Sequence, residues 1–297
     1  MRTKDESLVP WLEETRVWAE VQLEAALAGV ERGPARHTEA LRYALFSPGK
    51  RLRPALVRLV CEHLGGTDEQ AGPAAAAVEM IHTYSLVHDD LPCMDDDDLR
   101  RGRPTCHKVY GDAEAVLVGD SLQALAFEWL ALRGGPRAAQ QVAVLAASCG
   151  LAGLVGGQSL DLASDGSARF GVEEVREIHS LKTAALVSAA VDLGALAAGA
   201  GESQRVSMRA FGRALGLCFQ AVDDILDVTG DAASLGKTPG KDAAGGKATL
   251  VASLGLEGAR AEARHRAQAA RACATQAGCG EDSLALALVD HFLARSS

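Results

Sequence analysis

Apolar residues recur at helical spacing along almost the whole chain. In the segment "AVEMIHTYSLVHDD", Val78, Ile81 and Leu86 follow a period near 3.6 residues rather than the alternation of a strand. Ala and Leu dominate, and Gly and Pro fall between the apolar segments. No strong strand candidate emerges. The pattern predicts helices over residues 8–28, 37–46, 53–64, 70–90, 113–132, 138–159, 172–198, 203–228, 248–254, 257–276 and 281–294.

These segments predict an all-α protein. The 297 residues are enough for a large core, and no repeat or low-complexity linker divides them. We therefore expect one domain over residues 1–297, built as a bundle of long helices that cross a shared core. The uncharged stretch between Arg137 and Asp161 has the length of a membrane span. Its three Gln and several Gly residues favour a buried helix instead, so no membrane span is expected.

The charge and the cysteines narrow the class of protein. With 30 Lys and Arg against 39 Asp and Glu, the net charge is −9, whereas nucleic-acid-binding domains usually carry a basic stripe. No nucleic-acid partner is therefore expected. The seven cysteines are odd in number and irregularly spaced, which indicates free thiols in a reducing compartment. The start "MRTKDESLVPW" shows no signal peptide, and the chain is expected to be cytoplasmic.

An acidic cluster lies in the segment "QAVDDILDVTGD", residues 220–231. Asp223 and Asp227 are separated by four residues, so one helix face presents both carboxylates about 6 Å apart. Gln220 lies on the neighbouring turn of that face. The rest of the segment is apolar, which makes its polar stripe acidic only. Taken alone, an exposed charged helix end explains this pattern as well as a site does.

A second set of aspartates strengthens the functional interpretation. In "DDLPCMDDDDLRRGRPTCH", residues 89–107, six aspartates fall within ten residues. The preceding helix places His82, Ser85 and Asp89 on one stripe, and Pro92 should end that helix. Carboxylate oxygens without cysteine or paired histidine ligands suit a hard cation such as Mg²⁺, which also binds substrate phosphates.

Other metal and phosphate motifs fail on spacing. An EF-hand loop starting at Asp95 would need Gly where Arg100 stands and an acid where Cys106 stands. No pair of Glu-x-x-His motifs supports a di-iron bundle. The Gly- and Lys-rich segment 234–249 would need Gly in place of Asp231, and a strand before it, to be a P-loop. A loop that closes over phosphate and a plain surface loop both remain open for this segment.

Two basic segments supply the partners that phosphate groups require. "SPGKRLRP", residues 47–54, opens a helix after a Pro-Gly turn, and helix N-termini favour anions. It carries Lys50, Arg51 and Arg53, and the segment "LRRGRPTCH" adds Arg100, Arg101 and Arg103. Arginine forks suit phosphate oxygens. Two Arg-rich loops beside two Asp-rich helix ends fit two diphosphate sites, one held through metal and one held directly by cations.

The residues together resemble the trans-isoprenyl diphosphate synthases, most closely the bacterial short-chain farnesyl diphosphate synthases. The matching segments span roughly residues 40–250 in family order: "GKRLRP", "HTYSLVHDDLPCMDDDDLRRGRPTCH", "GQSLDL", "LKTAAL", "QAVDDILDVTGD" and "LGKT". The resemblance implies an all-α bundle around a deep central cavity and a homodimer. It also implies small-molecule diphosphate substrates and about three Mg²⁺ ions with substrate bound.

The resemblance also implies a role for each matching residue. Metal ligands would come from both aspartate motifs: Asp89, Asp90 and Asp95 in the first, and Asp223, Asp224 and Asp227 in the second. Clamps on the allylic diphosphate would be Arg100, Lys182 and Lys237. The isopentenyl diphosphate pocket would be formed by Lys50, Arg53, His82 and Arg101. Groups near the developing cation would be Thr183 and Gln220.

The implied reaction condenses isopentenyl diphosphate with dimethylallyl or geranyl diphosphate, through metal-assisted ionisation to an allylic cation. The departing diphosphate is expected to take the proton. In this family, bulk on the helix below the first motif sets product length, and Tyr84 and Ser85 occupy those positions. They favour (E,E)-farnesyl diphosphate, with a geranylgeranyl diphosphate synthase as the alternative.

Two further alternatives differ in class. A non-catalytic partner subunit of a prenyl synthase is more distant, because such relatives usually lose aspartate motifs and this chain keeps both. A terpene cyclase would not need the pocket of Lys50, Arg53 and His82 for a second diphosphate. The chain departs from the family where Ala-Thr-Leu-Val follows Lys247, and its C-terminal "HFLARSS" lacks the basic tail of some members.

Overall fold

Helices make up most of the part of the chain that the structure describes, which confirms the all-α prediction. This computed structural model describes residues 4–28, 33–164, 170–230 and 247–295. Its helices are α1 (Lys4–Leu27), α2 (Ala35–Leu45), α3 (Leu52–His63), α4 (Asp68–Asp89), α5 (Cys106–Tyr110), α6 (Asp112–Arg133), η1 (Gly135–Arg137), α7 (Ala138–Cys149), α8 (Leu154–Ser164), α9 (Val172–Ile178), η2 (His179–Ala184), α10 (Ala185–Ala197), α11 (Glu202–Thr229), α14 (Leu250–Gln276) and α15 (Leu284–Ala294).

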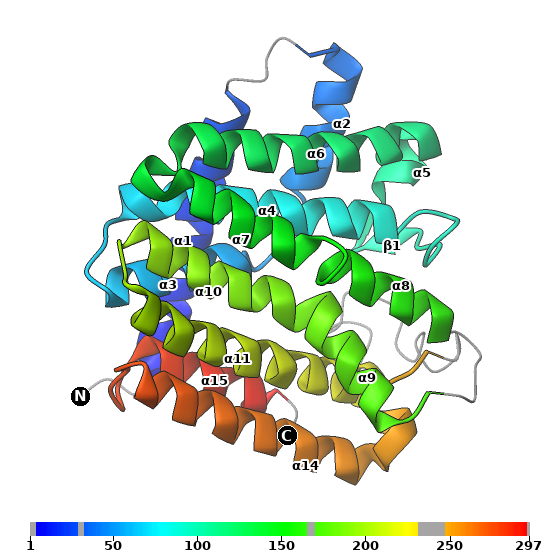
Figure 1. Cartoon of the computed structure of the whole chain (residues 1–297). Coiled ribbons are helices and arrows are strands. Elements are labelled where there is room, and N and C mark those ends of the chain that lie inside the picture. Colours follow the sequence, from blue (N-terminus) through cyan, green and yellow to red (C-terminus); the bar gives the residue numbers. More distant parts are fainter. Residues whose placement is uncertain (1–3, 29–32, 165–169, 231–246, 296–297) are drawn as a thin grey trace.

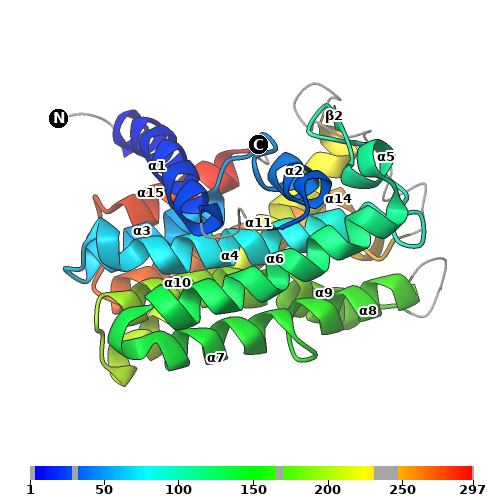
Figure 2. The same ribbon diagram turned by 90° about the horizontal axis from the view of Figure 1, so that it is seen from above.

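Helix α4 lies in the middle of the bundle and packs against α1, α3, α6 and α10 (Figure 2). It carries a run of four buried alanines, Ala74 to Ala77. Small side chains on several faces let neighbouring helices approach α4 from more than one side. Helix α11 packs against α10, α14 and α15. Both α4 and α11 end at the right-hand side of Figure 1, so the bundle brings their C-terminal ends to the same end of the molecule.

The ends of α4 follow from local sequence. Thr67 accepts a hydrogen bond from the Gln70 backbone N–H, and the Gln70 side chain accepts one from the Thr67 N–H, which forms a capping box. The helix ends at Asp89, as Pro92 predicts. Beyond it, the Asp95 N–H donates to the Asp89 carbonyl at 2.8 Å, so the chain turns back over the helix end.

The structure corrects several expected boundaries. Residues 138–159 are two helices, because the chain breaks between Cys149 and Leu154, where Gly150 and Gly153 lie. The short helix α5 and a two-stranded hairpin, β1 (Leu99–Arg100) with β2 (Arg103–Pro104), had no periodic signal. The break expected near residue 255 is present as a kink at Gly255, whose φ is +71°.

Three segments are long and apolar enough to cross a membrane by length and composition: Asp112–Arg133, Gly135–Ser164 and Val172–Ala197. The second is interrupted by the turn between α7 and α8, and the third is largely buried within the bundle. The expectation of no membrane span therefore stays a prediction. All seven cysteines are free thiols, as expected.

Candidate active site

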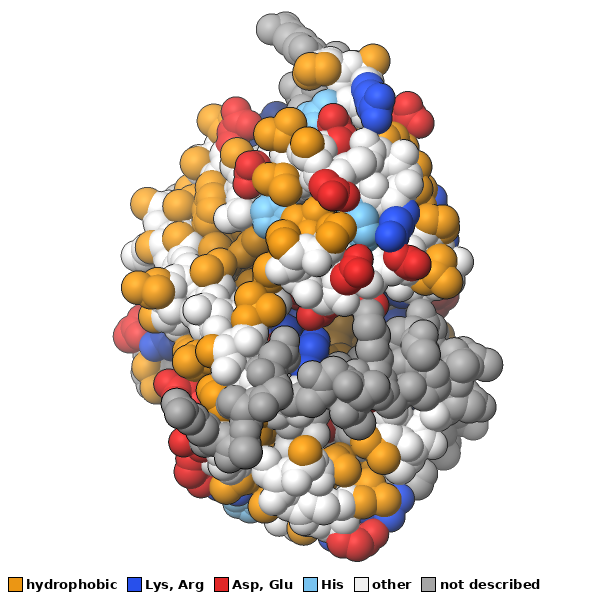
Figure 3. All heavy atoms as spheres, turned by 90° about the vertical axis from the view of Figure 1, so that its right-hand side faces the viewer, with side chains coloured by type: hydrophobic (Ala, Val, Ile, Leu, Met, Phe, Trp, Pro, Cys, Tyr) orange, Lys and Arg blue, Asp and Glu red, His pale blue; other side chains and the backbone are white. Residues whose placement is uncertain are grey.

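The two aspartate motifs meet at the end of the bundle where α4 and α11 finish (Figure 1). A short segment touches both of them. Lys247 Nζ lies 3.0 Å from Asp95 Oδ1, and the Leu250 N–H donates to Asp224 Oδ2 at 2.8 Å. Lys247 and Leu250 are three positions apart, and three residues of extended chain span at most about 11 Å. The two motifs that they touch therefore lie close together. Figure 3 views this end of the molecule and shows acidic and basic side chains together near the centre of the face.

The first motif is held by ion pairs. Asp90 is almost fully buried and receives three hydrogen bonds from the Arg100 guanidinium, at 2.5, 2.7 and 3.0 Å. Arg100 reaches it from the β1–β2 hairpin, which folds back over the end of α4. Asp95 pairs with Lys247, and Asp89 lies within electrostatic range of Lys182. Each carboxylate of this motif therefore has a cation of the chain beside it.

The carboxyl groups of the first motif differ in acidity. Burial raises the pKa of Asp89 to about 6, and the neighbouring Asp95 adds to the effect while Lys182 opposes it. Burial also raises the pKa of Asp90, although Arg100 works against it. Burial would raise the pKa of Asp95 too, but Lys247 outweighs it and leaves that pKa lowered. Of the three carboxylates, that of Asp89 is thus the one whose burial is offset least by nearby positive charge.

In the second motif, the described contacts of Asp224 come from an amide, a backbone N–H and an imidazole. Asp224 accepts hydrogen bonds from Gln220 Nε2 at 3.2 Å and from the Leu250 N–H, and His179 Nε2 lies 3.3 Å from its Oδ2. Asp227 is 2% exposed, whereas Asp223 on the same helix is partly exposed. The unbroken helix α11 fixes the spacing of these carboxylates, as the four-residue separation predicts.

A π-helical turn brings two more expected residues into the site. In η2, Lys182 Nζ donates to Asp161 Oδ2 at 2.6 Å, and Thr183 Oγ1 donates to Gln220 Oε1 at 2.7 Å. Such turns are frequent at functional sites, because they turn successive side chains in new directions. Gly157 allows this arrangement, since a Cβ there would lie 2.2 Å from the Lys182 backbone nitrogen.

The basic residues expected to bind the second diphosphate gather beside α4. A cavity of about 40 Å³ is lined by residues that include His82, Arg100 and Arg101. Burial lowers the pKa of Arg53 to about 10. Burial, with the charges of Arg53 and Arg101, holds the pKa of His82 well below its usual value. Positive charges crowd one another here, as expected of a site that receives an anion. The deep cavity implied by the resemblance stays a prediction.

Arg51 and Lys50 are adjacent in sequence but differ in their surroundings. Arg51 is buried with φ +49°, and its guanidinium is bound by Glu79 at 3.0 Å and by two backbone carbonyls. It holds the turn before α3 in place. Burial and the nearby Arg295 lower the pKa of Lys50, while Asp223 opposes them. Lys50 is therefore the residue of this pair that faces the site.

The expected chain-length residues lie below the first motif on α4. Tyr84 is 3% exposed and Ser85 is buried as well. Among the described residues the Tyr84 hydroxyl has no hydrogen-bond partner, and its ring packs edge-on against His88 with centroids 5.8 Å apart. Lys237, expected to clamp the allylic diphosphate, lies outside the described residues.

Sequence reasoning missed four side chains of this site. Three of them contact residues that were expected in the site: Lys247 contacts Asp95, Asp161 contacts Lys182, and His179 contacts Asp224. Arg295 lies within electrostatic range of Lys50, so the C-terminal segment does bring a basic side chain to the site. Asp161 lies in the matching segment "GQSLDL", so the sequence could have indicated it. The other three residues can be assigned to the site only from the fold.

The donor atoms fit the expected cation. The aspartates of the two motifs offer only carboxylate oxygens, and they reach the site from two helices that end together. Such ligands suit Mg²⁺, which takes one or two carboxylates and completes its shell with water and phosphate oxygens. The lysines and arginines around them would meet the phosphate oxygens that remain.

Comparison with known proteins agrees with this arrangement. The family model described as polyprenyl synthetase matches residues 34–282. A chloroplastic geranylgeranyl pyrophosphate synthase of Catharanthus roseus is 50% identical over 233 residues, which are 77% of this chain and 65% of that protein. A heterodimeric geranylgeranyl pyrophosphate synthase large subunit of Arabidopsis thaliana, also chloroplastic, is 49% identical over 237 residues, 77% of this chain and 64% of that protein. The chain thus spans about 65% of the length of the curated relatives it matches.

Solved structures match over almost the entire chain. An FPP/GFPP synthase of Zymomonas mobilis has a TM-score of 0.82 and 35% identity, covering 96% of this chain and 99% of that one. A geranyltransferase of Helicobacter pylori, solved with magnesium and isoprenyl diphosphate, has a TM-score of 0.81 and 30% identity, covering 96% and 97% of the two chains.

These comparisons correct one expectation and establish the family. The cytoplasmic location expected from the sequence is wrong by this comparison, because the curated relatives at about 50% identity are named as chloroplastic proteins. The family model covers most of the chain, and the fold and the two aspartate motifs agree with it. The chain therefore belongs to the polyprenyl synthetase family.

Proposed function

We propose that this protein is a geranylgeranyl diphosphate synthase, which adds isopentenyl diphosphate to an allylic diphosphate until the chain has 20 carbons. The observation that carries the reaction type is the meeting of two carboxylate motifs beside a cluster of lysines and arginines. The segment Lys247 to Leu250 touches both motifs, so both are within reach of one small ligand. Residues 1–297 are proposed to act as one domain.

The proposed roles follow from the contacts. Asp89, Asp95 and Asp223 would be the first ligands of about three Mg²⁺ ions, which would supply positive charge to the departing diphosphate. Lys182 and Arg100, now paired with Asp161 and Asp90, would turn toward its oxygens. We propose Asp90, Asp224 and Asp227 as the remaining ligand candidates, with Lys237 as a further clamp.

A second diphosphate would bind on the other side of α4. Lys50, Arg53, His82 and Arg101 are proposed to hold isopentenyl diphosphate, because positive charges that crowd one another gain most from an anion. The hydroxyl of Thr183 and the amide of Gln220 would lie near the allylic cation. No side-chain base is assigned, and the released diphosphate is proposed to accept the proton.

The product length rests on the relatives. The curated proteins near 50% identity are named geranylgeranyl pyrophosphate synthases, which favours the 20-carbon alternative over the farnesyl product expected from Tyr84 and Ser85. Farnesyl diphosphate remains a second candidate on one observation: the bulky Tyr84 is buried little more than one turn below Asp89.

A homodimer is proposed from the apolar surface of the helices that run from α6 to α8. Five large apolar side chains there are 40–87% exposed: Val116, Leu117, Leu132, Leu151 and Val155. Exposed apolar residues in such number mark an interaction surface. The retained aspartate motifs argue for an active subunit rather than a non-catalytic one, although one relative is the large subunit of a heterodimer.

The test is a product assay. Purified protein is incubated with isopentenyl diphosphate, Mg²⁺ and dimethylallyl, geranyl or farnesyl diphosphate, and the dephosphorylated prenols are separated by chromatography. Geranylgeraniol from all three allylic substrates is the expected result. Farnesol as the end product would keep the reaction type and overturn the chain length, and no product from any substrate would overturn the proposed activity.

A further inference from the structure

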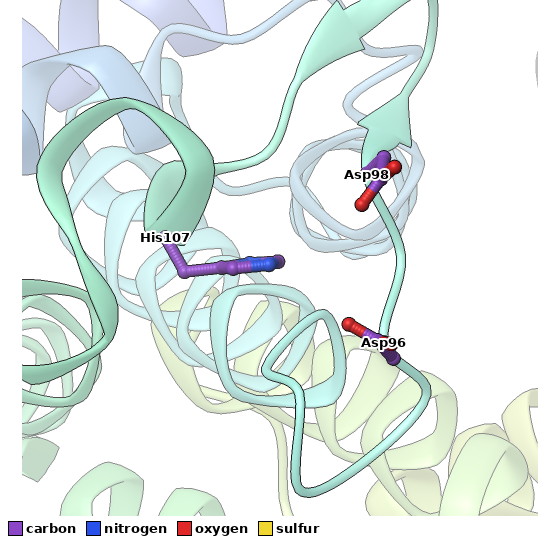
Figure 4. A group of neighbouring side chains, drawn as sticks. All are labelled: Asp96, Asp98 and His107. Atoms are coloured by element: carbon purple, nitrogen blue, oxygen red, sulfur yellow. The ribbon is translucent and has the colours of Figure 1, made fainter.

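Three potential metal ligands lie together outside the residues assigned to Mg²⁺. Asp96 and Asp98 belong to the loop between α4 and β1, and His107 is the second residue of α5. One ligand atom from each lies within 4.8 Å of the others. Figure 4 shows the imidazole of His107 directed into the space between the two carboxylates. Acidic loop residues alone would not indicate a site, so the state of His107 decides the interpretation.

The hydrogen bonds around Thr105 define the tautomer of His107. The Thr105 hydroxyl donates its single proton to the backbone carbonyl of Asp97, at 2.8 Å. Its oxygen lies 3.1 Å from His107 Nδ1 and must therefore accept a hydrogen bond from Nδ1–H. In a neutral imidazole the other nitrogen, Nε2, then carries an unprotonated lone pair. A hydrogen bond of this kind is the usual way in which a metal-binding histidine is oriented.

Nε2 of His107 is buried and lacks a hydrogen-bond partner among the described residues. The residue is 5% exposed, and its imidazole is directed into the space between the two carboxylates. A buried polar nitrogen without a partner costs free energy, on the order of 1–3 kcal/mol. A lone pair beside two negative groups is also electrostatically unfavourable. A cation placed between the three side chains would relieve both effects at once.

We propose that Asp96, Asp98 and His107 bind a divalent first-row transition-metal ion, of the Zn²⁺ or Mn²⁺ type, at a site separate from the Mg²⁺ carboxylates. One imidazole nitrogen with two carboxylate oxygens is a donor set that such ions accept, with water in the remaining positions. Ligand atoms about 2.1 Å from one ion lie closer together than 4.8 Å. The exposed side chains of Asp96 and Asp98 can rotate to close the difference.

Lys108 competes for this site. Its Nζ lies 2.7 Å from Asp98 Oδ1, so the ammonium would compete with the ion for this carboxylate. Both side chains of this pair are largely exposed, so the pair is weak and can open. Removal of the ammonium should therefore strengthen metal binding, whereas removal of a ligand should weaken it. Loss of binding with His107→Gln, which removes no negative charge, separates a metal site from a general effect of negative charge.

Metal binding here would brace the loop that serves the active site. The loop is already folded back by the Asp96 N–H on Leu91 and the Thr105 N–H on Asp98. An ion shared by Asp96, Asp98 and His107 would tie this loop to α5. Because the same loop and hairpin carry Asp95 and Arg100, the proposed ion would hold those residues in position without contacting substrate.

The test is a titration of metal-stripped protein with Co²⁺ in excess Mg²⁺, which keeps the all-oxygen sites occupied. Visible absorption and equilibrium dialysis measure the binding, and Zn²⁺ is then added as a competitor. One equivalent of Co²⁺ should bind and be displaced by Zn²⁺. Asp96→Asn, Asp98→Asn and His107→Gln should each weaken binding by about tenfold or more, and Lys108→Gln should strengthen it.

The variants are chosen so that folding does not confuse the result. Asp96 and Asp98 are exposed, and asparagine tolerates the positive φ of Asp96, +48°. Asp282→Asn removes the same charge from another exposed aspartate and should bind as the parent does. If the parent protein binds no Co²⁺ under these conditions, or if Asp98→Asn and His107→Gln bind it as tightly as Asp282→Asn, the proposal is wrong.

Discussion

The two aspartate motifs contain the same kind of residue but are organised in different ways. In the first, an irregular loop after α4 supplies the carboxylates, and Arg100, Lys247 and Lys182 lie beside them. In the second, the continuous helix α11 fixes the carboxylates, and Asp224 is met by an amide, a backbone N–H and an imidazole. One motif is held by exchangeable ion pairs and the other by regular secondary structure.

This difference indicates how the site would respond to substrate. The cationic side chains of the first motif are partly exposed, so they can exchange a carboxylate partner for a diphosphate. The backbone spacing of the second motif is fixed by the helix, whereas Asp95 of the first motif lies in a loop. We infer that ligand binding moves the backbone of the first motif more than that of the second. The variants below test whether the two motifs are equal in catalysis and unequal in stability.

Loss of one carboxylate from either motif should have the largest effect. Asp89→Ala and Asp223→Ala should each reduce turnover by about 10³-fold, because stabilisation of the leaving group is lost. Steady-state production of prenyl diphosphate from isopentenyl and allylic diphosphates measures it. Asp282→Ala is the control, and circular dichroism verifies the fold. Turnover near that of the parent in either variant would remove that motif from the metal site.

Arg100→Gln should reveal the ion pair that holds the first motif. Asp90 is buried and Arg100 is partly exposed, so removal of the guanidinium should leave a buried carboxylate without its partner and lower the free energy of unfolding by about 2 kcal/mol. Lys108→Gln is the matched control, because Lys108 pairs with the exposed Asp98 of the same loop. Urea unfolding measures both variants, and equal losses for the two would contradict the structural role of the Asp90 pair.

Asp89→Asn should have the opposite effect on stability. The carboxyl of Asp89 has its pKa raised from 3.8 to about 6 by burial, so the charged form is disfavoured in the fold. At pH 8 without metal, the amide should raise the free energy of unfolding by about 3 kcal/mol while activity is lost. Thermal or urea unfolding of the metal-free proteins checks the prediction.

The stability that Asp89→Asn gains over the parent protein should increase with pH. Below about pH 4 the carboxyl is protonated in both the folded and the unfolded protein, and the variant should gain nothing. Between pH 4 and 6 the unfolded chain releases the proton first, so the parent loses stability as the pH rises. The gain should be complete above pH 6. A gain that does not change with pH would show that the charge of Asp89 is not its cause.

Tyr84→Ala should have the smallest effect on turnover and change the product instead. Tyr84 is buried on the helix that leads to the first motif, and its removal should allow products longer than those of the parent. Phe219 precedes the second motif by a similar distance, but it packs against Phe292, with ring centroids 5.3 Å apart. Phe219→Ala should leave the product length unchanged. Chromatography of the prenols compares the two variants. An unchanged product profile for Tyr84→Ala would show that Tyr84 does not limit product length.

The same contrast explains how much could be predicted from sequence. The α11 motif follows from a four-residue spacing, and the ends of α4 follow from Thr67 and Pro92. The ion pairs of the first motif do not, because Lys247 lies 152 residues from Asp95 and meets it only through the fold. The break in residues 138–159 was missed because a helix can contain single glycines, and local sequence did not show that Gly150 would end one.

The most direct test of the account is a crystal structure with Mn²⁺ and a non-hydrolysable allylic diphosphate. The account predicts anomalous scattering from metal ions that bridge the diphosphate to Asp89 and Asp95 on one side and to carboxylates of α11 on the other. It also predicts that Arg100 or Lys182 leaves its carboxylate partner for a phosphate oxygen. A diphosphate held by only one of the two motifs would contradict the claim that both serve a single site.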